Sequence, residues 1–174
     1  MMITTWQIDA LGASSRDTFV GALGSIFEHS AWVAERAWDK RPFATLDALH
    51  QTMCGIVDAA DPALQLALIN AHPELAGKAA IRGELTAEST REQSGAGLDQ
   101  CTPEEFAELQ ALNHAYRERF GFPFILAVKG YDRAGILAQM RRRIDHDRPT
   151  ELRESLAQIY RIARFRLEAL ISEH

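Results

Sequence analysis

One strand-like stretch, Phe122 to Val128, is the feature that most restricts how this chain can fold. A single strand without a partner cannot form a sheet, so we expect this stretch to be extended or helical, and buried. The rest of the sequence carries the apolar spacing and the start signals of helices. The sequence therefore predicts an all-α fold, a helical bundle in which residues 1–174 form a single domain.

Helix boundaries are marked most clearly around Thr102. Thr102, the proline after it and Glu105 have the pattern of a capping box, and Gly121 suits the end of the same helix. Further caps are expected at Ser30, Thr45 and Asp61. The expected helices cover residues 17–29, 31–39, 46–60, 62–70, 103–120, 133–144 and 151–171.

Charge and cysteine content limit the partners of the chain. Its formal net charge of -5 gives no general attraction to nucleic acid or to an anionic membrane, and no apolar run is long enough to span a bilayer. The basic run from Arg141 to Arg143 precedes Asp145 and Asp147, so we interpret it as the solvated end of a helix. Cys54 and Cys101 form no C-x-x-C pair, and no secretory leader is evident, so we expect a cytoplasmic protein.

The dipeptide His72-Pro73 is the first candidate for chemistry. Proline disfavours helical geometry in the residue before it, which places the His72 imidazole at a helix boundary. A histidine held at a fixed junction can act as a general acid or base near neutral pH. The alternative is a capping or surface histidine, and for the dipeptide taken alone this alternative is the more common case.

A second candidate is the polar face formed by Ser89, Glu92 and Gln93. On a helix these residues lie on one side and offer a hydroxyl, a carboxylate and an amide together, which suits a polar heterocyclic ligand. The same spacing, Ser-x-x-Glu, is also that of a capping box. Taken alone, the short motif favours the cap, although one segment can serve both purposes.

Arg166 is the third candidate, because it interrupts an apolar stripe in the last predicted helix. The stripe consists of Leu152, Leu156, Ile159, Ala163 and Leu170. The missing step falls on Arg166, and a guanidinium in an inward position must reach solvent, pair with a carboxylate or face a ligand. A substrate carboxylate would match the arginine fork.

Several other chemistries lack their motifs. The sequence contains no H-E-x-x-H, no Glu-x-x-His of a di-metal bundle, no glycine-rich phosphate loop with its lysine, and no G-x-S-x-G. His50 and Cys54 form one pair at helical spacing, too few ligands for structural zinc, and we interpret Cys54 as a core residue. Two classes remain: an enzyme, or a non-catalytic module that captures a small ligand with a carboxylate.

Three ordered motifs together resemble the OHCU (2-oxo-4-hydroxy-4-carboxy-5-ureidoimidazoline) decarboxylase family. They are His72-Pro73-Glu74-Leu75-Ala76-Gly77, Ser89-x-x-Glu92-Gln93-x-x-Ala96-Gly97-Leu98, and Asn113-x-x-Tyr116-x-x-x-Phe120-Gly121-Phe122-Pro123-Phe124-Ile125. The resemblance runs from about Phe19 to the last helix. It implies an all-α homodimer that converts OHCU to (S)-allantoin with loss of carbon dioxide, without cofactor or metal.

The resemblance also implies roles for individual residues. His72 matches the catalytic histidine, and we expect Glu92 to work with it in orienting and protonating the substrate. The residues expected to bind the substrate are Pro73, Ser89, Gln93, Phe124, Ile125, Leu126, Ala127, Val128 and Arg166. Arg164 is a competing match for the last of these, but the apolar stripe places Arg166 inward. Glu74 stands where aspartate is frequent, a departure expected to have little consequence.

Overall fold

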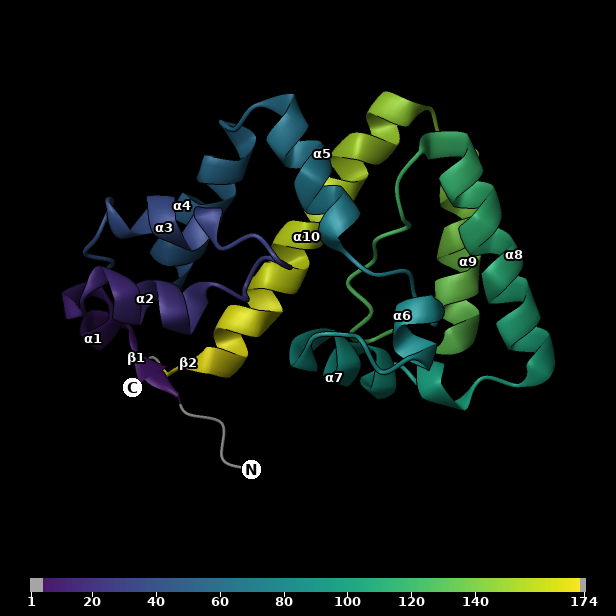
Figure 1. Cartoon of the computed structure of the whole chain (residues 1–174), viewed down its shortest axis with the longest axis horizontal. Helices are drawn as coiled ribbons and strands as arrows, with labels where there is room; N and C mark the ends of the chain where they lie inside the picture. The colour runs from purple at the N-terminus through teal and green to yellow at the C-terminus, as the bar shows by residue number, and fades with distance from the viewer. Residues whose placement is uncertain (1–4, 173–174) are drawn as a thin grey trace. The chain divides into compact units, whose positions relative to one another are not determined.

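The computed structural model describes residues 5–172, apart from the side chains of residues 78 and 79. The described residues are mainly helical, with one pair of very short strands, so the predicted all-α class is confirmed (Figure 1). They divide into two compact units, one made of residues 5–71 and 160–172 and the other of residues 72–159. The single domain expected over residues 1–174 stays a prediction, and its ends, residues 1–4 and 173–174, lie outside the described part.

The first unit is built from short helices and the strand pair. Its elements are β1 (Trp6–Gln7), α1 (Ile8–Ala13), α2 (Arg16–Leu23), α3 (Trp32–Trp38), α4 (Leu46–Asp58), α5 (Pro62–Ala71), the end of α10 (Arg148–Leu170) and β2 (Ile171–Ser172). β1 and β2 run parallel, with Trp6 opposite Ile171. The sequence does not predict this pair, because two residues are too few to show an alternation.

Helix starts in the first unit confirm one expected cap and contradict another. The Thr45 hydroxyl accepts a hydrogen bond from the Ala48 amide at 3.0 Å, as expected for the cap of α4. Ser30 does not cap α3: its hydroxyl donates to the Glu28 carbonyl, and α3 starts at Trp32 with Ala31 at the N-cap position and no side-chain cap. Ser30 is buried, and its short side chain reaches the preceding turn instead of the helix.

Two helices expected in the first unit are shorter than the sequence suggests. The helix expected over residues 17–29 ends at Leu23, and the chain then makes turns up to residue 30. Gly24, with its low helix propensity, is the first residue after this helix. The helix expected over 46–60 ends at Asp58, close to its expected limit.

Helices α4 and α5 are rich in apolar residues. They meet at a bend of 116° and only together reach the length and composition of a membrane span, which no single helix within residues 5–172 does. Leu49 and Met53 of α4 and Leu68 and Ile69 of α5 are fully buried.

The second unit contains the longer helices. Its elements are α6 (Lys78–Ile81), α7 (Ala87–Gly95), the short 3-10 helix η1 (Leu98–Gln100), α8 (Pro103–Phe120), α9 (Arg133–Arg143) and the first part of α10. α8 and α9 pack side by side (Figure 1). The capping box of α8 is confirmed: Thr102 and Glu105 each accept a hydrogen bond from the other's backbone amide. Gly121 ends α8 in the left-handed conformation, at φ 81°.

The stretch Phe122–Val128 is extended and buried along its whole length, as predicted, and it forms no strand ladder within the described residues. Its aromatic side chains join those of α8. Tyr116 makes edge contacts with Phe122 and Phe124, with ring centroids 5.9 and 5.4 Å apart. Aromatic burial of this kind anchors a stretch that has no regular hydrogen bonding of its own.

The buried side of α10 differs from the predicted apolar stripe in its first half. Ile159, Ala163 and Arg166 are buried as expected, whereas Leu152, Leu156 and Leu170 are only partly buried. The buried positions of α10 before Ile159 are polar: Glu151, Ser155 and Gln158. Polar side chains can occupy such positions when partners inside the protein satisfy them. A prediction from hydrophobicity alone therefore placed the buried face of the first half of α10 one residue too late in the sequence.

We expect Thr102→Ala to lower the free energy of unfolding by about 1 kcal/mol, because the Glu105 amide at the start of α8 loses its side-chain acceptor. Thr102→Ser is the matched control, since it keeps the hydroxyl. Urea unfolding followed by circular dichroism measures both variants. Equal losses in the two would show that the cap hydrogen bond contributes nothing to stability.

Candidate active site

His72 lies directly after the last residue of α5, Ala71, so the predicted helix boundary is confirmed. The residue is only 7% exposed, which rules out a surface histidine. Pro73, next to it, is partly buried. The imidazole is therefore held at a junction by its surroundings, as a group that acts on a bound ligand has to be.

The loop after His72 is fixed by a side chain of α7. Gln93 accepts a hydrogen bond from the Ala76 amide at 2.9 Å and donates to the Glu74 carbonyl at 3.4 Å. Ala76 has a positive φ of 51°, a conformation that residues other than glycine rarely adopt. The Glu74 carboxylate pairs with Arg117 at 2.8 Å. Gln93, expected to bind substrate, thus also shapes the loop beside His72.

Two amide side chains of α8 hold the same loop from another element. Gln110 donates to the Ala76 carbonyl at 2.7 Å, and Asn113 donates to the Leu75 carbonyl at 2.9 Å. The Asn113 bond is buried. Backbone groups that are buried without a regular partner need such side-chain partners, so α7 and α8 together determine the path of the chain after His72.

The polar face of α7 is arranged as its spacing predicts, but not as a capping box. Thr86 caps α7 by accepting a hydrogen bond from the Ser89 amide, so the capping interpretation of Ser89 is wrong. Ser89 and Gln93 are buried and Glu92 is partly buried.

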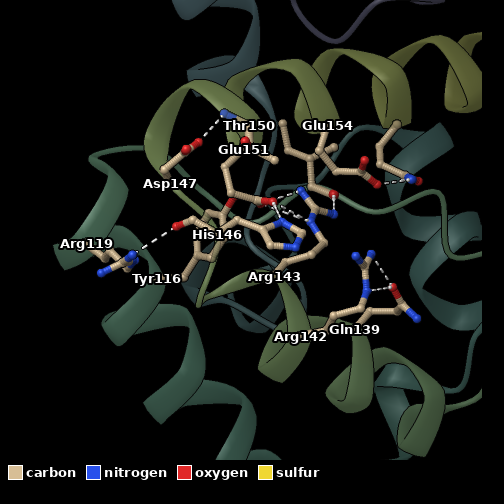
Figure 2. Close-up of polar contacts among 12 residues, drawn as sticks. Tyr116, Arg119, Gln139, Arg142, Arg143, His146, Asp147, Thr150, Glu151 and Glu154 are labelled. Atoms are coloured by element: carbon tan, nitrogen blue, oxygen red, sulfur yellow. Dashed lines mark hydrogen bonds and ion pairs between the residues drawn. The ribbon is translucent and has the colours of Figure 1, made fainter.

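The residues Phe124, Ile125, Leu126, Ala127 and Val128, expected to border the substrate, are all buried in the second unit. Beside them lies Arg143, which is fully buried and paired with Glu151 at 2.9 Å (Figure 2). The interpretation of the basic run as a solvated helix end is therefore wrong for Arg143, although Arg141 and Arg142 are exposed.

A sequence signal for Arg143 does exist. In α9 the buried residues Ile136, Met140 and Arg143 follow one another at steps of four and three. This is the same pattern that singled out Arg166, but the neighbouring arginines and the end of the helix concealed it. Glu151 and Gln158 carry no comparable signal, because their buried partners Arg143 and Ala127 lie on other elements.

Arg166 is part of the first unit, whereas the other predicted site residues are part of the second. It is 7% exposed and pairs with Glu28 at 2.9 Å, while its other amino group donates to the Ser25 carbonyl. Its predicted inward position is thus confirmed. The competing Arg164 is more exposed and pairs with Glu168. That Arg166 binds the substrate stays a prediction.

Cys54 is not suited to be a nucleophile. Burial raises the pKa of its thiol to about 12, so the thiol stays protonated at neutral pH. Its helical neighbour His50 binds the Tyr160 carbonyl at 2.8 Å. This pair therefore forms part of the packing of the first unit.

Comparison with known proteins gives a consistent result. A family model described as OHCU decarboxylase matches residues 12–168. A 2-oxo-4-hydroxy-4-carboxy-5-ureidoimidazoline decarboxylase from Haloferax volcanii is 46% identical over 95% of this chain and 94% of its own length. A uric acid degradation bifunctional protein from Bacillus subtilis is also 46% identical over 97% of this chain, which spans only 33% of that protein.

A solved structure agrees with these sequence matches. The crystal structure of an (S)-allantoin synthase superimposes with a TM-score of 0.78 at 29% identity. The match covers 95% of this chain and 54% of that one. This chain thus corresponds to about half of the larger synthase chain and to nearly the full length of the Haloferax protein.

We expect Asn113→Ala to lower the free energy of unfolding by about 1–3 kcal/mol, because the Leu75 carbonyl loses its buried donor. His114→Ala, at the exposed next position of α8, is the control and should change stability by less than about 0.5 kcal/mol. Chemical unfolding measures both. A loss for Asn113→Ala no larger than that of the control would contradict the role of Asn113 in holding the loop.

Proposed function

The chain belongs to the OHCU decarboxylase family, and we propose that it converts OHCU to (S)-allantoin with release of carbon dioxide, in the breakdown of urate. One observation carries the proposal. The family match runs from residue 12 to residue 168 and includes every residue expected to act on the substrate. The match to the Haloferax decarboxylase covers 94% of that protein, which supports assigning the activity to this chain by itself.

The chemistry requires no external electron sink. In OHCU the carbon that carries the carboxylate is attached to a polarised C=N system. When the bond between this carbon and the carboxylate breaks, carbon dioxide leaves and the bonding electrons move into that system. A proton then adds to one face of the ring, which determines the configuration of allantoin. The protein has to orient the carboxylate and deliver the proton from one side, and both tasks are matters of positioning and fixed polarity.

In this proposal His72 and Glu92 orient the substrate and supply the proton. The burial of His72 at the end of α5 supports a fixed role for the imidazole. Ser89 and Gln93, on the same face of α7, hold the ring or the ureido group, and Pro73 lies beside it. Arg166 counters the negative charge of the carboxylate.

The segment Phe124–Val128 borders the substrate through its backbone. Its burial supports this role, because peptide groups are effective hydrogen-bonding partners for a small polar ligand where water is excluded. A non-helical segment also leaves peptide groups that no neighbouring turn of a helix occupies.

His72→Ala should abolish enzymatic production of (S)-allantoin, leaving the racemic product of spontaneous decay. The assay generates OHCU freshly and follows the sign and rate of the circular dichroism change, with thermal unfolding to show that the variant is folded. His114→Ala, an exposed histidine of α8, serves as the control. A folded His72→Ala protein that makes (S)-allantoin at the native rate would disprove the role of His72. If wild type binds the ureide without accelerating its conversion, the chain is a binding module instead.

We also propose that the chain works as a homodimer, as the resemblance to its family implies, and in the cytoplasm, as its cysteine content suggests. Sedimentation equilibrium should then give a mass twice the 19.4 kDa of the chain. A single species at the mass of one chain, at micromolar concentration, would contradict the dimer.

A further inference from the structure

The buried stretch Phe122–Val128 obtains hydrogen-bonding partners from side chains. Within the described residues it belongs to no ladder of strands. The Ile125 carbonyl accepts a hydrogen bond from Arg143 at 2.5 Å, and the Ala127 amide donates to Gln158 at 3.0 Å. These two bonds hold two peptide groups that lie inside the segment proposed to border the substrate. The position of that segment therefore depends on Arg143 and Gln158.

Arg143 is itself held rigidly. Its guanidinium lies over the Phe124 ring, 4.4 Å from the centroid, and its Nε donates to Glu151 at 3.0 Å (Figure 2). The same carboxylate accepts hydrogen bonds from the Tyr116 hydroxyl and is 2.9 Å from Nδ1 of His146. Burial, reinforced by the bond to Glu151, raises the pKa of Tyr116, so its hydroxyl keeps the proton it donates. Arg143 thus has little freedom to move.

Gln158 is anchored in the same way. Its amide oxygen accepts from the Ala127 amide, while its amide nitrogen donates to Glu154 at 3.1 Å, one turn earlier on α10. Both ends of the side chain are engaged, so the orientation of the amide group is determined. Arg143 on α9 and Gln158 on α10 therefore hold neighbouring parts of the segment from two helices.

Stability alone gives little reason for this buried ion pair. Replacing a buried pair by apolar residues of similar volume is often neutral or stabilising, because the ions need not be removed from water. What apolar residues cannot supply is a donor to the Ile125 carbonyl. We propose that Arg143 and Gln158 are positioning residues, which set the backbone face that Phe124–Val128 presents to the substrate and thereby the side from which the proton arrives. The inference rests on the proposed function.

The test compares two folded variants with wild type. Arg143→Met combined with Glu151→Leu removes the hydrogen bond to the Ile125 carbonyl without leaving an unpaired buried charge. Gln158→Met removes the acceptor of the Ala127 amide without altering any charge. Each should lower kcat/KM by about 10- to 100-fold, because small displacements of a binding surface have effects of this size. Each should also lower the enantiomeric excess of allantoin, extrapolated to high enzyme concentration so that spontaneous decay contributes nothing.

Arg142→Met is the matched control, because Arg142 lies next to Arg143 on α9 but is exposed and binds Gln139 (Figure 2). It should retain the native rate and enantiomeric excess. The enantiomeric excess separates positioning from stability, since a smaller folded fraction does not change it at saturating enzyme. Folded Gln158→Met protein with native kcat/KM and native enantiomeric excess would overturn the inference, even if the double variant fails to fold. If wild type does not accelerate OHCU conversion, the proposed function fails first and the inference fails with it.

Discussion

The Glu151 carboxylate is completely buried, and it organises the helices of the second unit. Its oxygens meet Tyr116 from α8, Arg143 from α9 and His146 from the turn between α9 and α10. A buried carboxylate costs several kcal/mol unless its hydrogen-bonding capacity is satisfied. Satisfying it requires residues from these segments to meet at one point, which restricts how they can pack. Through Arg143 the same carboxylate also influences the buried extended segment.

The proposed site depends on two non-helical stretches in a helical unit. One follows His72, and its backbone is held by amide side chains of α7 and α8. The other is Phe122–Val128, held by Arg143 and Gln158. Inside a helix the backbone groups are occupied by neighbouring turns, so non-helical stretches such as these two are where interior backbone groups can face a ligand. Side-chain hydrogen bonds then replace the ones that regular structure would provide.

Arg166 and Arg143 show which buried arginines a sequence pattern can identify and which it cannot. Both arginines are buried and paired with a glutamate from another segment, and both continue the buried stripe of a helix. Arg166 stood out because apolar residues surround it on the stripe. Arg143 was hidden by two exposed arginines beside it. Gln158 was missed because a glutamine on a helix carries no sign of its burial, which depends on a distant backbone amide.

The sequence by itself determined the helical class, the capping box at Thr102, the boundary at His72 and the burial of the stretch Phe122–Val128, which it left open as extended or helical. These features follow from local rules, since a cap, a proline or an unpaired strand involves residues close together in the chain. Only the tertiary structure decided which polar side chains are buried, among them Glu151 and Gln158, and that Gln93 shapes the loop beside His72. Most buried polar groups have a hydrogen-bonding partner, and the side chains named here find theirs on other elements of the fold, which the local sequence does not reveal.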